Sequence, residues 1–151
     1  MAKERLVIIC PGRGSYTRES SGYLNSKKNI ADQEISWMNN QREATNLPTL
    51  NELDSSTFKS KIHMIGVNAS PLIYACSYVD FFSINKNKYE IVAITGNSMG
   101  WYTTLALSGV LTFQNAFKLI NVMSSLTKDD NGGQIIYPIV NQNWQIDKST
   151  Y

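Results

Sequence analysis

The sequence predicts an α/β fold with a parallel sheet whose two faces are both covered by helices. Two short apolar runs, Leu6 to Cys10 and Ile91 to Ile94, have the continuous pattern of strands that are buried on both faces. Each run ends in a glycine-rich turn, and helical patterns lie between and after the runs. Strands that alternate with helices in this way are typical of a three-layer core.

Composition indicates one globular domain. Of 151 residues, 42% are hydrophobic and 17% are charged, which is enough apolar material for a core. The net charge is +2 without long runs of one sign, so no basic face for nucleic acid is indicated. The first apolar run is too short for a signal peptide or a membrane span. We therefore expect a cytoplasmic protein with neither nucleic acid nor membrane as partner.

Two helices are predicted between the strands, besides a short one that ends the segment from Asn46 to Ser56. The first spans Ile30 to Glu43, with Ala31, Ile35 and Met38 on its apolar face. The second begins with Ser70 as N-cap and Pro71 in its first turn. It ends before the loop Asn85 to Lys88, and its apolar face holds Leu72, Ala75, Cys76, Val79 and Phe82. Cys10 and Cys76 lie in apolar stretches without ligand spacing, so we expect reduced core cysteines and no metal site.

The second strand leads into Gly96-Asn97-Ser98-Met99-Gly100, which matches the G-x-S-x-G pattern of a nucleophile elbow. In such a turn the serine hydroxyl stands above the sheet, and the two glycines leave room for neighbouring backbone. The helix that follows would allow the Met99 N–H to donate to an oxyanion. Ser98 is therefore the candidate nucleophile.

The first strand leads into the turn Pro11-Gly12-Arg13-Gly14-Ser15-Tyr16. Ligands of parallel sheets bind at the carboxyl ends of the strands, where this turn would lie. It has neither the third glycine of a dinucleotide fingerprint nor a Gly-Lys-Ser ending, so we expect it to bring a backbone N–H close to a ligand.

After the serine turn, Gly109 is suited to end one helix and Thr112 to cap the next. The apolar face of that next helix holds Phe113, Ala116, Phe117, Ile120 and Met123. A polar turn is predicted at Lys128 to Gly133, and a strand at Gln134 to Val140.

Taken together, these segments resemble the malonyl-CoA:acyl carrier protein transacylase family, which includes the acyltransferase domains of polyketide synthases. That family opens with a strand and P-G-Q-G-S-Q, here Pro11 to Tyr16, and its elbow reads G-H-S-L-G-E, here Gly96 to Trp101. Its elbow helix ends A-G-V-L, here Leu107 to Leu111, and Ser70-Pro71-Leu72 is similar to its T-Q-P-A segment. The likeness extends to about Val140.

The resemblance implies a hydrolase-like core and a two-step acyl transfer in fatty acid or polyketide biosynthesis. Ser98 would take an acyl group from acyl-CoA as an ester and pass it to the phosphopantetheine thiol of an acyl carrier protein. The backbone N–H groups of Met99 and Arg13 match the oxyanion donors of the family. No bound cofactor is implied.

The sequence departs from the family at several positions. Asn97 replaces a histidine, Trp101 replaces a glutamate, and Met123 falls where the family has the arginine that pairs with the malonyl carboxylate. With Gly12 and Gly14, these three residues are the candidate substrate-binding set, although all three also fit ordinary packing roles. We therefore expect neutral acyl groups to be preferred over malonyl groups.

The base histidine of the family lies further downstream than Tyr151. The single histidine, His63, matches no catalytic position, and we expect it to have a structural or surface role. We assign residues 1–126 to the core and 127–151 to the entry of a small ferredoxin-like lobe, which we expect to be incomplete. Either the chain is the first part of a longer acyltransferase, which we favour because missing strands would expose apolar side chains, or it is a non-catalytic carrier-binding module. A serine esterase or thioesterase is the alternative from another chemical class.

Overall fold

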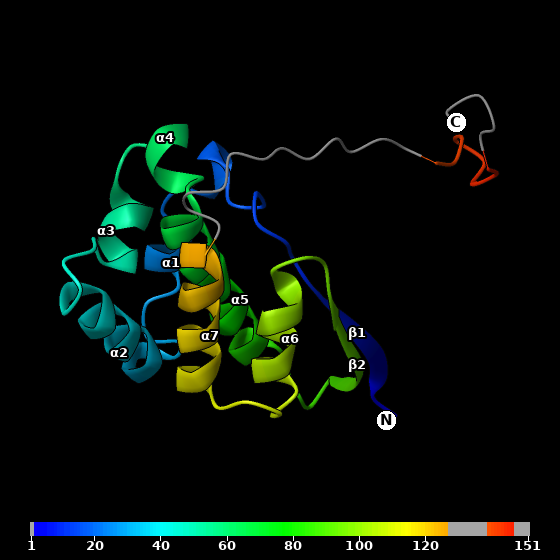
Figure 1. The fold of residues 1–151 in the computed structure, drawn as a ribbon. Coiled ribbons are helices and arrows are strands. Elements are labelled where there is room, and N and C mark those ends of the chain that lie inside the picture. Colours follow the sequence, from blue (N-terminus) through cyan, green and yellow to red (C-terminus); the bar gives the residue numbers. More distant parts are fainter. Residues whose placement is uncertain (1, 127–138, 147–151) are drawn as a thin grey trace.

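The computed structural model describes residues 2–126 and 139–146. Figure 1 shows a block of helices beside a narrow sheet. In the described residues the sheet has two parallel strands, β1 (Glu4–Cys10) and β2 (Tyr89–Gly96), with Glu4 opposite Tyr89 and Cys10 opposite Gly96. Because the strands are parallel, the turns that follow them lie at the same edge of the sheet.

The helices fall into two groups along the chain. Between the strands the structure has η1 (Arg18–Ser20), α1 (Tyr23–Ser26), α2 (Asp32–Glu43), α3 (Leu50–Ser55), α4 (Ser60–His63) and α5 (Gly66–Ser83). After β2 come α6 (Gly100–Leu107) and α7 (Phe113–Leu126). Helix α5 packs against α7, α6 and α3, and its Leu72, Tyr74 and Ala75 are fully buried. The core therefore lies among the helices, with α6 between them and both strands.

Most of the predicted elements are confirmed. Both strands, the helix in Ile30 to Glu43, and the short helix before Ser56 are present. Gly109 has a φ of 79° just after α6, and Thr112 Oγ1 accepts the Asn115 N–H at 3.2 Å at the start of α7. The predicted turn at 128–133 and all but the end of the strand at 134–140 lie outside the described residues. Val140 itself forms an isolated antiparallel bridge with Ile146.

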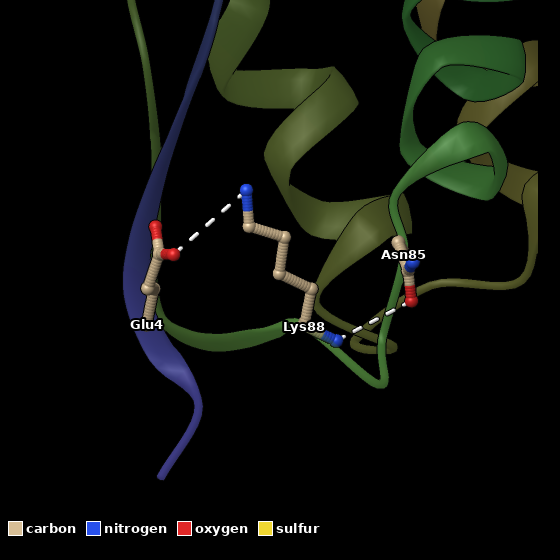
Figure 2. Close-up of polar contacts among 3 residues, drawn as sticks. All are labelled: Glu4, Asn85 and Lys88. Carbon is tan, nitrogen blue, oxygen red and sulfur yellow. Dashed lines mark hydrogen bonds and ion pairs between the residues drawn. The ribbon is translucent and has the colours of Figure 1, made fainter. Parts of the chain in front are cut away.

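The connection into β2 is tied to the start of β1 (Figure 2). Lys88 Nζ lies 3.8 Å from Glu4 Oε1, and the Lys88 N–H donates to Asn85 Oδ1 at 3.3 Å. The Glu4 N–H in turn donates to the Lys88 carbonyl at 3.0 Å. These contacts hold the two strands in register at the end opposite the serine turn.

The prediction that both strands are buried on both faces is wrong for the residues that the structure describes. Ile8 and Ile94 pack against the core, but Val7 and Ile9 are 52% and 71% exposed, and Val92 is 39% exposed. Successive side chains of a strand point to opposite faces, and α6 covers one of them. The strands therefore have an apolar face that no described element covers.

The prediction that Ser70 and Pro71 start a helix is also wrong, because α5 already begins at Gly66. Proline in a helix interior cannot donate to the carbonyl four residues earlier, here that of Val67. The guanidinium of Arg42 replaces the missing donor, with Nη1 at 2.8 Å from the Val67 oxygen. A contact from another helix thus lets α5 continue through Pro71.

Three smaller expectations have mixed outcomes. Phe82, predicted on the buried face of α5, is 47% exposed near the end of that helix. Ala31 precedes α2 in a left-handed conformation, although it still packs against the core. Cys10 and Cys76 are both free thiols, as expected, and burial raises the pKa of Cys76 to about 12.

In the described residues, no helix is both long enough and apolar enough to cross a membrane.

Candidate functional site

Ser98 lies in a tight turn between β2 and α6. Its φ is 53°, a left-handed value that costs a residue with a Cβ about 1–2 kcal/mol. The Gly100 N–H donates to the Asn97 carbonyl at 2.8 Å, and the Trp101 N–H donates to the Ser98 carbonyl at 3.1 Å. Ser98 itself is exposed. Strained backbone at an exposed polar residue is typical of functional sites.

The two glycines of the motif are required by close packing of backbone. A Cβ on Gly96 would lie 2.3 Å from the Gly100 carbonyl carbon, and a Cβ on Gly100 would lie 2.2 Å from the Cys10 oxygen. Both distances are far below any real contact between non-bonded atoms. Gly100 thus lets the turn approach the end of β1, and Gly96 lets α6 start directly over β2.

The turn after β1 lies against the serine turn. A Cβ on Gly12 would lie 3.0 Å from the Asn97 carbonyl oxygen and 3.3 Å from the Ser98 Cβ. The Asn97 N–H also donates to the carbonyl of Cys10 at 3.1 Å. The backbone that follows Gly12, at Arg13, is therefore held near Ser98.

A cleft of about 280 Å³ opens at Ser98. Four of the predicted site residues line it: Arg13, Ser98, Met99 and Met123. The remaining lining residues are Ser70, Tyr102, Ile120 and Ser124. The cleft thus joins the two turns to α5, α6 and α7.

The other predicted residues lie around the cleft. Gly12 and Asn97 contact each other behind Ser98, as described above. Trp101 does not line the cleft, and its side chain is 55% exposed. Gly14 does not line it either; its φ is 105° and its Cα faces open space.

Sequence reasoning missed three polar residues of the cleft. Tyr102 lies in the first turn of α6, four residues after Ser98, so helical spacing could have indicated it. Ser70 has the sequence pattern of an N-cap, and this pattern masks its place inside α5. Ser124 donates its hydroxyl to the Ile120 carbonyl at 2.6 Å within α7, and no local pattern points to it.

His63 is placed apart from this chemistry. It is 1% exposed and packs against the rings of Phe58 and Tyr16. Its Nδ1 lies 3.0 Å from the Lys59 amide nitrogen, and its Nε2 lies 3.0 Å from the Leu53 carbonyl oxygen. Both ring nitrogens are engaged by backbone, which confirms the structural role expected for His63.

Two further features of the described residues bear on the choice of site. A larger groove of about 400 Å³ between α2 and α7 contains none of the predicted site residues. No group of three or more potential metal-ligating side chains is present in the described part of the chain. The Ser98 cleft is therefore the best candidate site.

No protein-family model matches the chain, and no curated protein matches it. Among solved structures it is similar to the acyl-carrier-protein S-malonyltransferase from Burkholderia pseudomallei 1710b. The identity is 18%, the TM-score is 0.61, and the match covers 83% of this chain but 39% of that one. The resemblance predicted from the sequence is thus confirmed at the level of fold: this chain has the α/β acyltransferase fold over part of that enzyme's length.

Proposed function

We propose that this protein is an acyltransferase that uses Ser98 as nucleophile. The serine oxygen attacks the thioester carbonyl of an acyl-CoA, forming an ester while the carbon–sulfur bond breaks and the CoA sulfur takes up a proton. The phosphopantetheine thiol of an acyl carrier protein then attacks this ester, and Ser98 recovers its proton as the new thioester forms. The acyl group comes from a substrate, so no bound cofactor is needed.

The observation that carries the proposal is the paired turns at the edge of the sheet. Ser98 occupies a strained turn between β2 and α6, and Gly12 brings the first turn to within contact of it. The backbone N–H groups of Met99 and Arg13 are the oxyanion donors in this proposal, and both residues line the cleft. One such donor is worth about 3 kcal/mol in the transition state of acyl transfer.

We further propose that the acyl group is neutral. Met123 lines the cleft with a thioether, which cannot form the charged, bidentate contact that a carboxylate makes with arginine. The malonyl specificity in the name of the similar structure is a property of that enzyme and is not assigned to this chain.

Ser98 also needs a group to accept its proton. The described residues that line the cleft include neither a histidine nor a carboxylate, and both ring nitrogens of His63 are engaged elsewhere. A serine hydroxyl without a base is a poor nucleophile. In our proposal the base is contributed by a group outside the described lining of the cleft.

The test is the intact mass of the protein after incubation with malonyl-CoA, acetyl-CoA and longer acyl-CoAs, with Ser98→Ala as control. We expect an acyl adduct that is absent in Ser98→Ala and that forms with neutral acyl groups in preference to malonyl. Equal labelling by malonyl-CoA and acetyl-CoA would contradict the neutral preference. Turnover of acyl-CoA without any carrier thiol would instead indicate a thioesterase.

A further inference from the structure

An exposed apolar patch lies where α4 leads into α5. Ile62, Met64 and Ile65 are 40%, 51% and 45% exposed, although each is a large hydrophobic side chain. Isolated exposed apolar residues are normal, but three within four positions concentrate apolar surface in one short segment. We call this surface, together with the exposed Lys59 and Lys61, the α4 patch.

The α4 patch carries positive charge, and its own segment of the chain contains no acidic residue. No aspartate or glutamate occurs between Asp54 and Asp80, whereas Lys59 and Lys61 both lie in that interval. Among the described residues, neither lysine is in an ion pair. An apolar centre with charged residues at its rim is the usual composition of a protein interface.

The patch adjoins the Ser98 cleft. Arg13 Nη1 lies 2.9 Å from the point where a Cβ on Gly66 would stand, and the Ser124 carbonyl oxygen lies 3.1 Å from the same point. Arg13 and Ser124 both line the cleft, and Gly66 directly follows Ile65. In Figure 1, α4 lies at the end of α5 farthest from the N-terminus of the chain.

The base of the patch is held in place by the buried His63. A single turn such as α4 is not stable alone, because helix nucleation fixes several residues for one hydrogen bond. The Lys59 N–H donates to His63 Nδ1, and the imidazole is packed between Phe58 and Tyr16. The exposed lysines and apolar side chains therefore project from a preorganised support, which lowers the entropy lost on binding.

We propose that the α4 patch is the docking surface for an acidic carrier protein that brings a thioester arm to Ser98. This inference rests on the proposed function and names the surface that would receive its partner. The occupant is a protein whose carboxylates surround a small apolar centre, since that chemistry complements two lysines around three apolar side chains. A patch of this size fits a weak, transient contact, which suits a carrier that must leave after each transfer.

The direct test is titration of the full chain with an acidic acyl carrier protein in its apo form, which lacks the arm, followed by NMR. Because the arm is absent, binding reports the protein surface alone. We expect Lys59→Glu/Lys61→Glu to weaken binding about tenfold, and Met64→Ser to weaken it with less dependence on salt. Raising the salt from about 50 mM to about 300 mM should weaken wild-type binding, because exposed charges are screened.

The matched control is Lys3→Glu/Lys86→Glu, which makes the same change of charge near the amino ends of β1 and β2. Equal loss of affinity in both double variants would overturn the proposal, because net charge and not the patch would then control binding. A second outcome would also overturn the proposal. In it, the wild type binds anionic phosphatidylglycerol vesicles, Lys59→Glu/Lys61→Glu loses this vesicle binding while the control variant keeps it, and binding to the carrier protein is unchanged.

Failure of docking can be separated from failure of the proposed function. The Ser98 adduct formed from acyl-CoA needs no carrier protein, so we expect Lys59→Glu/Lys61→Glu to form it at the wild-type rate. If the Ser98 adduct forms but the patch variant binds the carrier protein as well as the wild type does, the docking surface is rejected and the acyltransferase proposal stands. If no adduct forms but the patch variant binds the carrier protein more weakly than the wild type, the role of Ser98 as nucleophile is rejected and the docking surface stands.

Discussion

Two regions of the molecule treat polar groups in opposite ways. In the helical block, the side chains of Arg42, Asp54 and His63 are at most 1% exposed, and each is surrounded by hydrogen-bond partners. At the carboxyl edge of the sheet, Ser98 is exposed and its backbone is strained. In the first region the polar side chains hold helices together, whereas in the second region a polar side chain, that of Ser98, is exposed to solvent.

The buried groups are satisfied without opposite charges. Arg42 donates to the carbonyls of Pro48 and Val67 and to Asn68 Oδ1, at 2.5 to 2.8 Å. Asp54 accepts the Tyr16 hydroxyl at 2.7 Å and two N–H groups of Asn25. Burial lowers the pKa of Arg42 to about 10, as expected for a cation that leaves water. A buried ionisable residue with every partner in place is a structural element, even where it is the single histidine of a chain.

The largest expected effect concerns the strained region. Gly100→Ala should cost about 4 kcal/mol or more of unfolding free energy, because its Cβ would lie 2.2 Å from the Cys10 oxygen, which is backbone. Urea denaturation measures this cost. Gly109→Ala is the control. The φ of Gly109 is 79°, which is left-handed, but a Cβ there would have no atom within 4 Å, so we expect a cost of about 1 kcal/mol in unfolding free energy. Equal costs would mean that close packing does not define the serine turn.

The next effect concerns the buried region. Arg42→Met should cost about 3 kcal/mol, because it leaves the carbonyls of Pro48 and Val67 without their donor in the interior. Arg18→Met, at an exposed position of η1, should change stability by less than about 0.5 kcal/mol. Urea denaturation of both variants compares them directly. A small cost at Arg42 would show that α5 tolerates Pro71 without help.

A smaller effect is expected at alkaline pH. The hydrogen bond that Tyr23 donates to Asp80 raises the pKa of Tyr23 to about 12, and burial is the second contribution to this rise. The pKa of a tyrosine in an unfolded chain is about 10. The folded chain then holds a proton that the unfolded chain has lost, so this contribution is complete below about pH 10 and disappears as the pH rises through about 12. Urea unfolding against pH should show this loss, and Tyr23→Phe should reduce its slope. An unchanged slope in Tyr23→Phe would assign the loss to other groups.

Substitutions of Ser98 are expected to change stability the least and the chemistry the most. Ser98→Gly removes the Cβ that is strained at a φ of 53°, so it should leave stability unchanged or raise it by up to about 1 kcal/mol. Ser98→Ala keeps the strain and should match the wild type. Both variants should lose the acyl adduct in intact-mass measurements. A marked loss of stability in Ser98→Gly would show that the hydroxyl has a structural role.

Sequence reasoning performed best where a feature depends on neighbouring residues. The strand, serine turn and helix around Ser98 were all predicted, since glycine spacing and apolar runs are local signals. It performed worst where distant residues decide. The true start of α5 depends on Arg42, which lies 25 residues before Val67, and no local signal overrides the apparent N-cap at Ser70.

The sequence by itself determined the two strands, the longer helices and the likeness to an acyltransferase, because these follow from periodicity and motif spacing. The tertiary structure alone decided which faces are covered and which side chains meet. Packing places Tyr102 and Ser124 beside Ser98, buries His63, and leaves Ile9 exposed on the open face of the sheet. The physical reason is that burial and proximity are properties of pairs of elements, which no single segment encodes.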